Sequence, residues 1–107
     1  VVLVMNGESL CGIFSERDLA TRVVARGLDP VKTLLRDVMT LDVVTIPPTC
    51  EASDALHLMQ HHHCRHLPVV ENGRVVAMVS LRDLYRTLRD RLERECFEIR
   101  SYVFASY

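Results

Sequence analysis

The chain contains one internal repeat, and this repeat limits the folds open to it more than any other feature. Asn6-Gly7 is followed by Ser15-Glu16-Arg17-Asp18-Leu19, and Asn72-Gly73 is followed by Ser80-Leu81-Arg82-Asp83-Leu84. The Ser-x-Arg-Asp-Leu blocks are 65 residues apart and the Asn-Gly pairs 66 apart, which predicts one extra residue in the first hairpin loop. In 107 residues this repeat indicates two small copies, the first lacking its front half.

Turn signals and hydrophobic patterning predict similar elements around both blocks. Apolar, β-branched runs flank each Asn-Gly pair, which is typical of β-hairpins. The predicted strands are 1–5 and 9–14 in the first copy, and 67–70 and 75–79 in the second. A further strand at 43–46, stopped by Pro47-Pro48, and a helix at 51–63 capped by Thr49 precede the second hairpin.

Each hairpin leads into a predicted helix. The first helix spans 16–26, with Leu19, Val23 and Val24 on its apolar face, and a linker at 28–35 follows it. The last helix opens at Ser80 and keeps an apolar face for more than twenty residues, up to about Leu92 as a core helix. Beyond that point the apolar residues lack obvious cover, which predicts a partner surface and a homodimer; they are Cys96, Phe97, Ile99, Tyr102, Val103 and Phe104.

Composition excludes several classes of protein. The net charge of −1 gives no electrostatic excess for nonspecific binding to nucleic acid or to an anionic membrane. No apolar run approaches the ~20 residues of a transmembrane helix. The four cysteines form no C-x-x-C pair, so we expect reduced, mostly buried thiols in a cytoplasmic protein.

The Ser-x-Arg-Asp blocks have two interpretations. In one they are capping boxes, in which the serine hydroxyl accepts a hydrogen bond from a backbone N–H and the aspartate favours the helix dipole. In the other they also bind a ligand, because an ionised carboxylate accepts the hydrogen bonds that the two hydroxyls of a ribose donate. Two such sites facing each other would form a cleft.

The order strand, helix, hairpin, helix closely resembles the CBS domain (cystathionine β-synthase domain), a module found in tandem in many regulatory proteins. Its members typically carry Gly-hydrophobic-x-Ser/Thr-x-x-Asp ahead of the last helix. Gly12-Ile13-Phe14-Ser15-Glu16-Arg17-Asp18 fits this pattern, and Ala77-Met78-Val79-Ser80-Leu81-Arg82-Asp83 fits it with Ala in place of Gly. Other similar segments are Asp37-Val38-Met39-Thr40, Val44-Thr45-Ile46-Pro47 and Cys64-Arg65-His66-Leu67-Pro68-Val69, so the resemblance covers roughly residues 1–90.

The resemblance implies an α/β fold of tandem CBS repeats, each a small mixed three-stranded sheet with two helices, paired about a pseudo-twofold axis. Residues 1–36 would be the C-terminal half of the first repeat plus the linker. Residues 37–92 would be the second repeat, and 93–107 a C-terminal helical extension.

The resemblance also implies a regulatory module, not an enzyme, that binds AMP, ADP, ATP, S-adenosylmethionine or NADH between its repeats. Asp18 and Asp83 would hold ribose hydroxyls with Ser15 and Ser80, while Thr45, Ile46 and Pro47 would line an adenine pocket. Arg65, His66 or Arg82 would reach phosphates, with Arg17 beside the first carboxylate as Arg82 is beside the second. The alternative is a structural dimerisation module with empty clefts.

A small metal- or redox-responsive protein is a further alternative, because His61-His62-His63-Cys64 and His66 are zinc-binding residue types. Consecutive helix residues are separated by about 100° and cannot converge on one ion. His57 and His61 share a face but form only half a site, so we expect no metal. Gly7 and Gly12 are not followed by the Lys-Ser/Thr of a phosphate-binding loop, and no catalytic motif is present.

Overall fold

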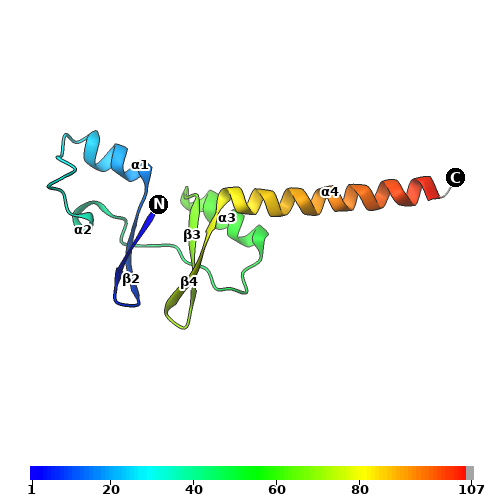
Figure 1. The fold of residues 1–107 in the computed structure, drawn as a ribbon, viewed down its shortest axis with the longest axis horizontal. Helices are drawn as coiled ribbons and strands as arrows, with labels where there is room; N and C mark the ends of the chain where they lie inside the picture. The colour runs from blue at the N-terminus through cyan, green and yellow to red at the C-terminus, as the bar shows by residue number, and fades with distance from the viewer. Residues whose placement is uncertain (106–107) are drawn as a thin grey trace. The chain divides into compact units, whose positions relative to one another are not determined.

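The computed structural model describes residues 1–105, with side-chain detail for residues 1–98. Its elements form two compact units, the first containing residues 1–48 and 68–78 and the second containing 49–67 and the chain from residue 79 onward. Figure 1 labels these elements along the chain, and the mixed α/β fold expected from the sequence is confirmed. In order they are β1 (Val2–Asn6), β2 (Ser9–Phe14), α1 (Glu16–Asp18), the π-helix η1 (Leu19–Val24), α2 (Leu35–Val38), α3 (Ala52–His62), β3 (His66–Glu71), β4 (Arg74–Ser80) and α4 (Leu81–Ala105).

Both predicted hairpins are confirmed, and both have two-residue turns. β1 pairs antiparallel with β2, with Asn6 opposite Ser9, so the turn is Gly7-Glu8. Gly7 has φ +64°, as the first position of a type II′ turn requires. In the second hairpin Asn72 and Gly73 both have positive φ, as in a type I′ turn.

The predicted extra loop residue is therefore wrong. The turns themselves are 65 residues apart, like the serine blocks, and the first Asn-Gly pair simply begins one residue before its turn. The first hairpin does contain an irregularity, but it lies within the strands. Val4 faces Gly12 whereas Met5 faces Leu10, which leaves the intervening Cys11 in a β-bulge.

The predicted helix at 16–26 is only partly correct. One short turn, α1, continues directly into η1, where Ala25 N–H donates to the Ala20 carbonyl five residues back. Of the three residues placed on its apolar face, only Val23 is buried, while Leu19 and Val24 are exposed. The wider π turn shifts each residue around the axis, so an α-helical pattern no longer identifies the buried face.

The predicted strand at 43–46 is wrong apart from one residue. Ile46 donates to the Pro68 carbonyl at 3.0 Å and accepts from Val70 N–H at 2.8 Å, forming a single parallel bridge to β3. The pairing stops there because Pro47 and Pro48 have no N–H to donate. Ile46 and Val69 are buried in the first unit, together with Val23 and Val38.

In the second unit, α3 packs on the first turns of α4 (Figure 1). Helical spacing predicts an apolar face on this helix made of Ala52, Ala55, Leu56 and Met59; Ala55 and Met59 are buried with Leu67 and Leu84, and the other two are half-buried, so the face is confirmed. The predicted Thr49 cap is wrong. Glu51 is the N-cap, and its carbonyl accepts from Ala55 N–H without any bond from its side chain.

Helix α4 extends well past α3 (Figure 1), and its apolar residues lose their cover along the way. Leu84 is buried and Leu88 half-buried, whereas Leu92 is 61% and Phe97 71% exposed. Cover thus ends before Leu92, one turn earlier than predicted. The predictions for the side chains of Ile99, Tyr102, Val103 and Phe104 lie outside the described residues. Over the part of the chain that the structure describes, no helix is long and apolar enough to span a membrane.

Candidate functional site

The second Ser-x-Arg-Asp block forms a capping box at the start of α4. Asp83 N–H donates to the Ser80 hydroxyl at 3.1 Å, and Ser80 N–H donates to Oδ2 of Asp83 at 3.4 Å. Leu81 N–H donates to the Arg65 carbonyl at 2.8 Å, which holds the residue preceding β3 against the first turn of the helix. The capping interpretation is confirmed here, and it brings Arg65, Ser80 and Asp83 together.

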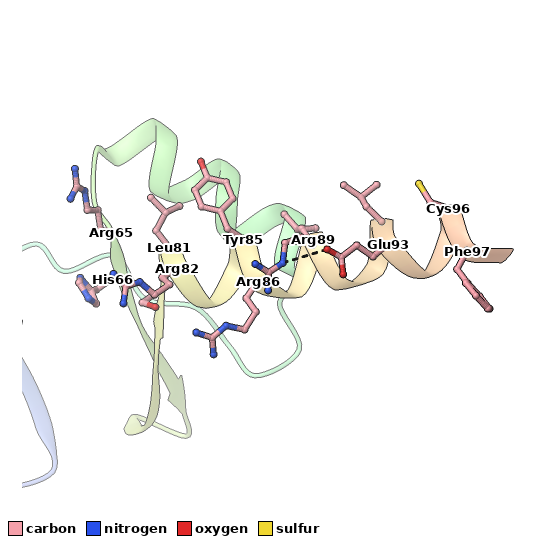
Figure 2. A pocket seen from close by; sticks show the side chains of 13 residues that line it. Arg65, His66, Leu81, Arg82, Tyr85, Arg86, Arg89, Glu93, Cys96 and Phe97 are labelled. Atoms are coloured by element: carbon pink, nitrogen blue, oxygen red, sulfur yellow. Dashed lines mark ion pairs between the residues drawn. The ribbon is translucent and has the colours of Figure 1, made fainter. Parts of the chain in front are cut away.

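A broad groove begins at this helix start and follows α4 (Figure 2). Its volume of about 1670 Å³ exceeds that of ordinary ligand pockets, because the groove is open to solvent. We call it the basic groove, since its charged lining is four arginines and His66 against one carboxylate, Glu93. Its lining residues are Arg65, His66, Ser80, Leu81, Arg82, Tyr85, Arg86, Leu88, Arg89, Leu92, Glu93, Cys96 and Phe97.

The electrostatics at the start of the groove keep Asp83 ionised. Hydrogen bonding from the Ser80 hydroxyl, and then from the Ser80 backbone, holds the pKa of Asp83 below its ordinary value, with Arg86 and Arg82 adding to the effect. Burial lowers the pKa of His66, and Arg65 lowers it further while Asp83 opposes the shift. Asp83 does not itself line the groove, but its ionised carboxylate is hydrogen-bonded to Ser80, which does, and it carries a negative charge at neutral pH close to the guanidinium groups of Arg82 and Arg86.

The first block forms an equivalent but more closed capping box in the other unit. Ser15 N–H donates to Oδ2 of Asp18 at 2.9 Å, and Asp18 N–H donates to the Ser15 hydroxyl at 3.2 Å. The other carboxylate oxygen of Asp18 lies 3.7 Å from Nε of Arg22, and the Asp18 side chain is only 16% exposed. Arg17 is exposed on α1. The two copies thus differ in how many carboxylate oxygens already have a partner within the chain. Asp18 uses both of its oxygens, whereas Asp83 uses one.

The residues predicted to contact adenine lie in the segment that bridges to β3. Thr45 and Pro47 are exposed, whereas Ile46 is 5% exposed and its backbone is fully used by the bridge. Ile46 is therefore a core residue of its unit. In this segment only Thr45 and Pro47 present accessible surface to a ligand.

The histidine-rich end of α3 forms no metal site among the described residues, where no group of three or more His, Cys, Asp or Glu could hold an ion. His61 and His62 pack against each other at a ring distance of 4.9 Å, and His63 ends the helix in a left-handed conformation. Cys11, Cys50 and Cys64 are half-buried free thiols, but Cys96 is exposed, contrary to the expectation of mostly buried cysteines.

Sequence reasoning identified the apolar residues Leu92, Cys96 and Phe97 of the outer helix but missed the basic groove residues beyond the first turn of α4. Arg86 and Arg89 follow Arg82 at helical spacing and line the same groove, and Tyr85, directly before Arg86, also lines it and is 54% exposed. The Arg82-x-x-x-Arg86-x-x-Arg89 spacing could have indicated them, because residues three and four apart share a helix face.

Comparison with known proteins places these observations in a family. The CBS domain family model matches residues 35–90, slightly more than half of the chain. The CBS domain-containing protein CBSCBSPB2 of Arabidopsis thaliana is 40% identical over 94 residues, covering 88% of this chain. The chain spans only 17% of that relative's length.

Solved structures agree with this assignment. A signal-transduction protein with CBS domains from Burkholderia ambifaria superposes with a TM-score of 0.78 at 32% identity, over 81% of this chain and 64% of that one. A CBS domain protein from Pyrobaculum aerophilum, complexed with AMP, gives a TM-score of 0.64 at 32% identity, over 73% of this chain and 58% of that one. The fold of this chain is a small α/β module of the kind used in tandem, and the chain belongs to the CBS domain family.

Proposed function

We propose that this chain is a regulatory module that binds an adenosine-containing ligand, with its principal contacts at the start of the basic groove. The observation that carries the proposal is the juxtaposition of Ser80, Asp83 and the arginines Arg65 and Arg82 at the first turn of α4. The AMP complex of the Pyrobaculum aerophilum relative supports the ligand class.

Each group at the first turn of α4 and at the start of β3 has a chemical role in the proposal. The Asp83 carboxylate accepts hydrogen bonds from the ribose 2′- and 3′-hydroxyls, and the Ser80 hydroxyl assists. Arg65 and Arg82 pair with phosphate oxygens, which match the planar fork of a guanidinium. His66 is mainly neutral at pH 7 because its pKa is lowered, so it contributes a hydrogen bond in place of a charge.

The second-copy block is the better ribose site of the two. Asp18 already uses both carboxylate oxygens, one for the Ser15 backbone and one for Arg22. Among the described residues no ion pair engages Asp83, and its second oxygen is free for a ligand. We therefore propose weaker binding at Ser15, Arg17 and Asp18. Thr45, Ile46 and Pro47 remain proposed adenine contacts on the strength of the family resemblance, with Thr45 and Pro47 the accessible members.

The proposed mechanism is a population shift in a cytoplasmic, noncatalytic module. A ligand that binds one arrangement of the two repeats better than another favours that arrangement by its differential affinity. A homodimer through the modules and the helical extension would transmit the change. AMP, ADP, ATP, S-adenosylmethionine and NADH all carry the ribose that Asp83 would hold, so the proposal extends to this class. A structural dimerisation module remains the second candidate because Leu92 and Phe97 on α4 are exposed.

Isothermal titration with AMP, ATP and S-adenosylmethionine tests the ligand proposal. We expect binding by the wild type that Asp83→Ala abolishes and Asp83→Asn weakens, since Asn can keep the bond from Ser80 N–H but loses the charge. Asp90→Ala is the matched control, because it removes an exposed carboxylate from the same helix. No binding of any of the three at millimolar concentration, or equal binding by the wild type and Asp83→Ala, would contradict the proposal.

A further inference from the structure

The outer part of α4 carries an apolar stripe that the described chain does not cover. Tyr85 is 54%, Leu92 61% and Phe97 71% exposed, and Cys96 is also exposed. Tyr85, Leu92 and Cys96, with the half-buried Leu88 among them, form the stripe and line the basic groove, as does Phe97; Figure 2 shows Tyr85 and Cys96 on one side of α4 and Phe97 on the other. An exposed stripe of this length on one helix marks an interaction surface.

The spacing of the stripe suits a straight helix partner. Tyr85, Leu88, Leu92 and Cys96 follow at steps of three, four and four, an eleven-residue period. This period is about 3.67 residues per turn, close to the 3.6 of an undistorted α-helix, whereas a seven-residue period imposes a left-handed supercoil. The stripe therefore runs nearly parallel to the axis of α4, and a second straight helix can lie along it over several turns.

The charges beside the stripe indicate a second copy of α4 in the opposite direction. Arg82, Arg86 and Arg89 line one flank of the stripe, and Glu93 continues that flank one turn later. A twofold axis across the helix would bring this flank against itself in reverse order, so that Arg89 of one copy meets Glu93 of the other. In a parallel pair the opposite flanks would meet instead. Arg86 would then face Arg91, and Glu93 would face Glu98, which are like charges.

We propose that two copies of this chain associate through antiparallel α4 helices centred between Asp90 and Arg91. Leu88 of one copy then packs on Leu92 of the other, and Arg89 pairs with Glu93 across the interface, twice by symmetry. Within one chain, Nε of Arg89 lies 3.9 Å from Oε1 of Glu93, a long ion pair, and both side chains are more than half exposed, so both can turn to a partner (Figure 2). This inference gives a geometry to the dimer in the proposed function, and it does not depend on the ligand.

The proposed register makes a prediction about Cys96. At 1.5 Å per residue, the two Cys96 residues of an antiparallel pair centred there would be about 16 Å apart along the helices. A disulfide needs Cα atoms within about 7 Å. In a parallel pair the two cysteines would lie side by side and could form a disulfide.

Sedimentation velocity from 1 to 200 µM tests the association on the full chain. We expect reversible dimers, with Arg89→Glu and Glu93→Arg each weakening dimerisation about tenfold. An equimolar mixture of these two variants should regain dimerisation, because the charges are then complementary between copies but remain mismatched within each chain. Arg94→Glu is the control, since it makes the same charge change at an exposed position on the face of α4 away from the stripe. Helical content by circular dichroism separates lost association from a lost helix.

Disulfide trapping tests the direction of the helices. In a Cys96→Ser background, a Leu88→Cys copy mixed with a Leu92→Cys copy should form a disulfide on mild oxidation, and peptide mapping identifies it among the other cysteines. A wild-type Cys96–Cys96 bond as the main product, a monomer throughout the concentration range, or dimers that Arg89→Glu leaves unchanged would each overturn the proposal. Asp83→Asn should weaken AMP binding without affecting dimerisation, so failure of the ligand proposal remains distinguishable.

Discussion

Replacing Gly12 by Ala tests how the first hairpin is packed. Gly12 lies in β2 at the position where the second copy has Ala77. A Cβ atom at Gly12 would lie 2.5 Å from Sδ of Met39, 2.8 Å from its Cγ and 2.9 Å from the Thr40 carbonyl oxygen. Ala77 is exposed in β4. The same small side chain is thus tolerated in one copy and predicted to be disruptive in the other.

The cost of this substitution in the free energy of unfolding depends on which of the atoms near the new Cβ can move away. The Met39 side chain is flexible and can turn away at modest cost. The Thr40 carbonyl cannot, because it accepts from Ile13 N–H at 3.0 Å while Thr40 N–H donates to the Ile13 carbonyl at 2.9 Å. Overpacking of this kind costs about 1–3 kcal/mol in the free energy of unfolding. Loosening the two backbone bonds would bring the cost toward the upper end of that range.

Urea denaturation and hydrogen exchange measure this effect. We expect Gly12→Ala to lower the free energy of unfolding by about 1–3 kcal/mol and to speed exchange of the Ile13 and Thr40 amides. Ala77→Gly is the matched control and should cost under about 1 kcal/mol. Met39→Ala in the Gly12→Ala background should restore part of the stability, because it removes the two closest atoms. Wild-type stability and exchange in Gly12→Ala would refute the packing described here.

Three further predictions concern the core, the capping box and the thiols. Leu67→Ala should lower the free energy of unfolding by about 2–5 kcal/mol, because Leu67 is fully buried. Leu92→Ala, at an exposed position, should change it by under about 0.5 kcal/mol. Chemical denaturation of both variants checks this, and equal losses would contradict it. Because the pKa of Asp83 is lower in the folded chain than in the unfolded chain, the ionised carboxylate stabilises the fold at pH values above the ordinary pKa of an aspartate, about 4, and this contribution is lost as the pH falls through the folded pKa. An NMR titration should show the Asp83 carboxyl titrating at a lower pH than an ordinary aspartate, and Ser80→Ala should raise its pKa. Burial raises the pKa of Cys64, so iodoacetamide at pH 8 should modify it more slowly than the exposed Cys96, as peptide mass spectrometry would show; faster modification of Cys64 would contradict the assigned burial.

Features set by local chemistry were predictable from the sequence. The Ser15 and Ser80 capping boxes depend on residues three apart, and the structure forms both. The hairpins follow from short turns between apolar runs, although the exact turn at Gly7-Glu8 depended on the pairing of Asn6 with Ser9. The apolar face of α3 could also be predicted, because Ala55 and Met59 repeat at helical spacing.

Features set by pairing between distant segments were not predictable in the same way. The strand expected at 43–46 contracts to Ile46 because its partner segment and its continuation contain prolines, which interrupt the hydrogen-bond ladder. The π-helix at Leu19–Val24 could not be distinguished from an α-helix over so few turns. At the candidate site, the repeat identified Ser80, Arg82 and Asp83, but the groove beyond them emerges only when Arg86 and Arg89 are seen to line the same face of α4.

A crystal structure of the chain with AMP tests the central claim most directly. We predict electron density for the nucleotide at the first turn of α4, with the ribose hydroxyls on the Asp83 carboxylate and the phosphate among Arg65, His66 and Arg82. Crystals grown at saturating AMP that show this end of the basic groove without nucleotide, or that show AMP bound away from Asp83, would contradict the account.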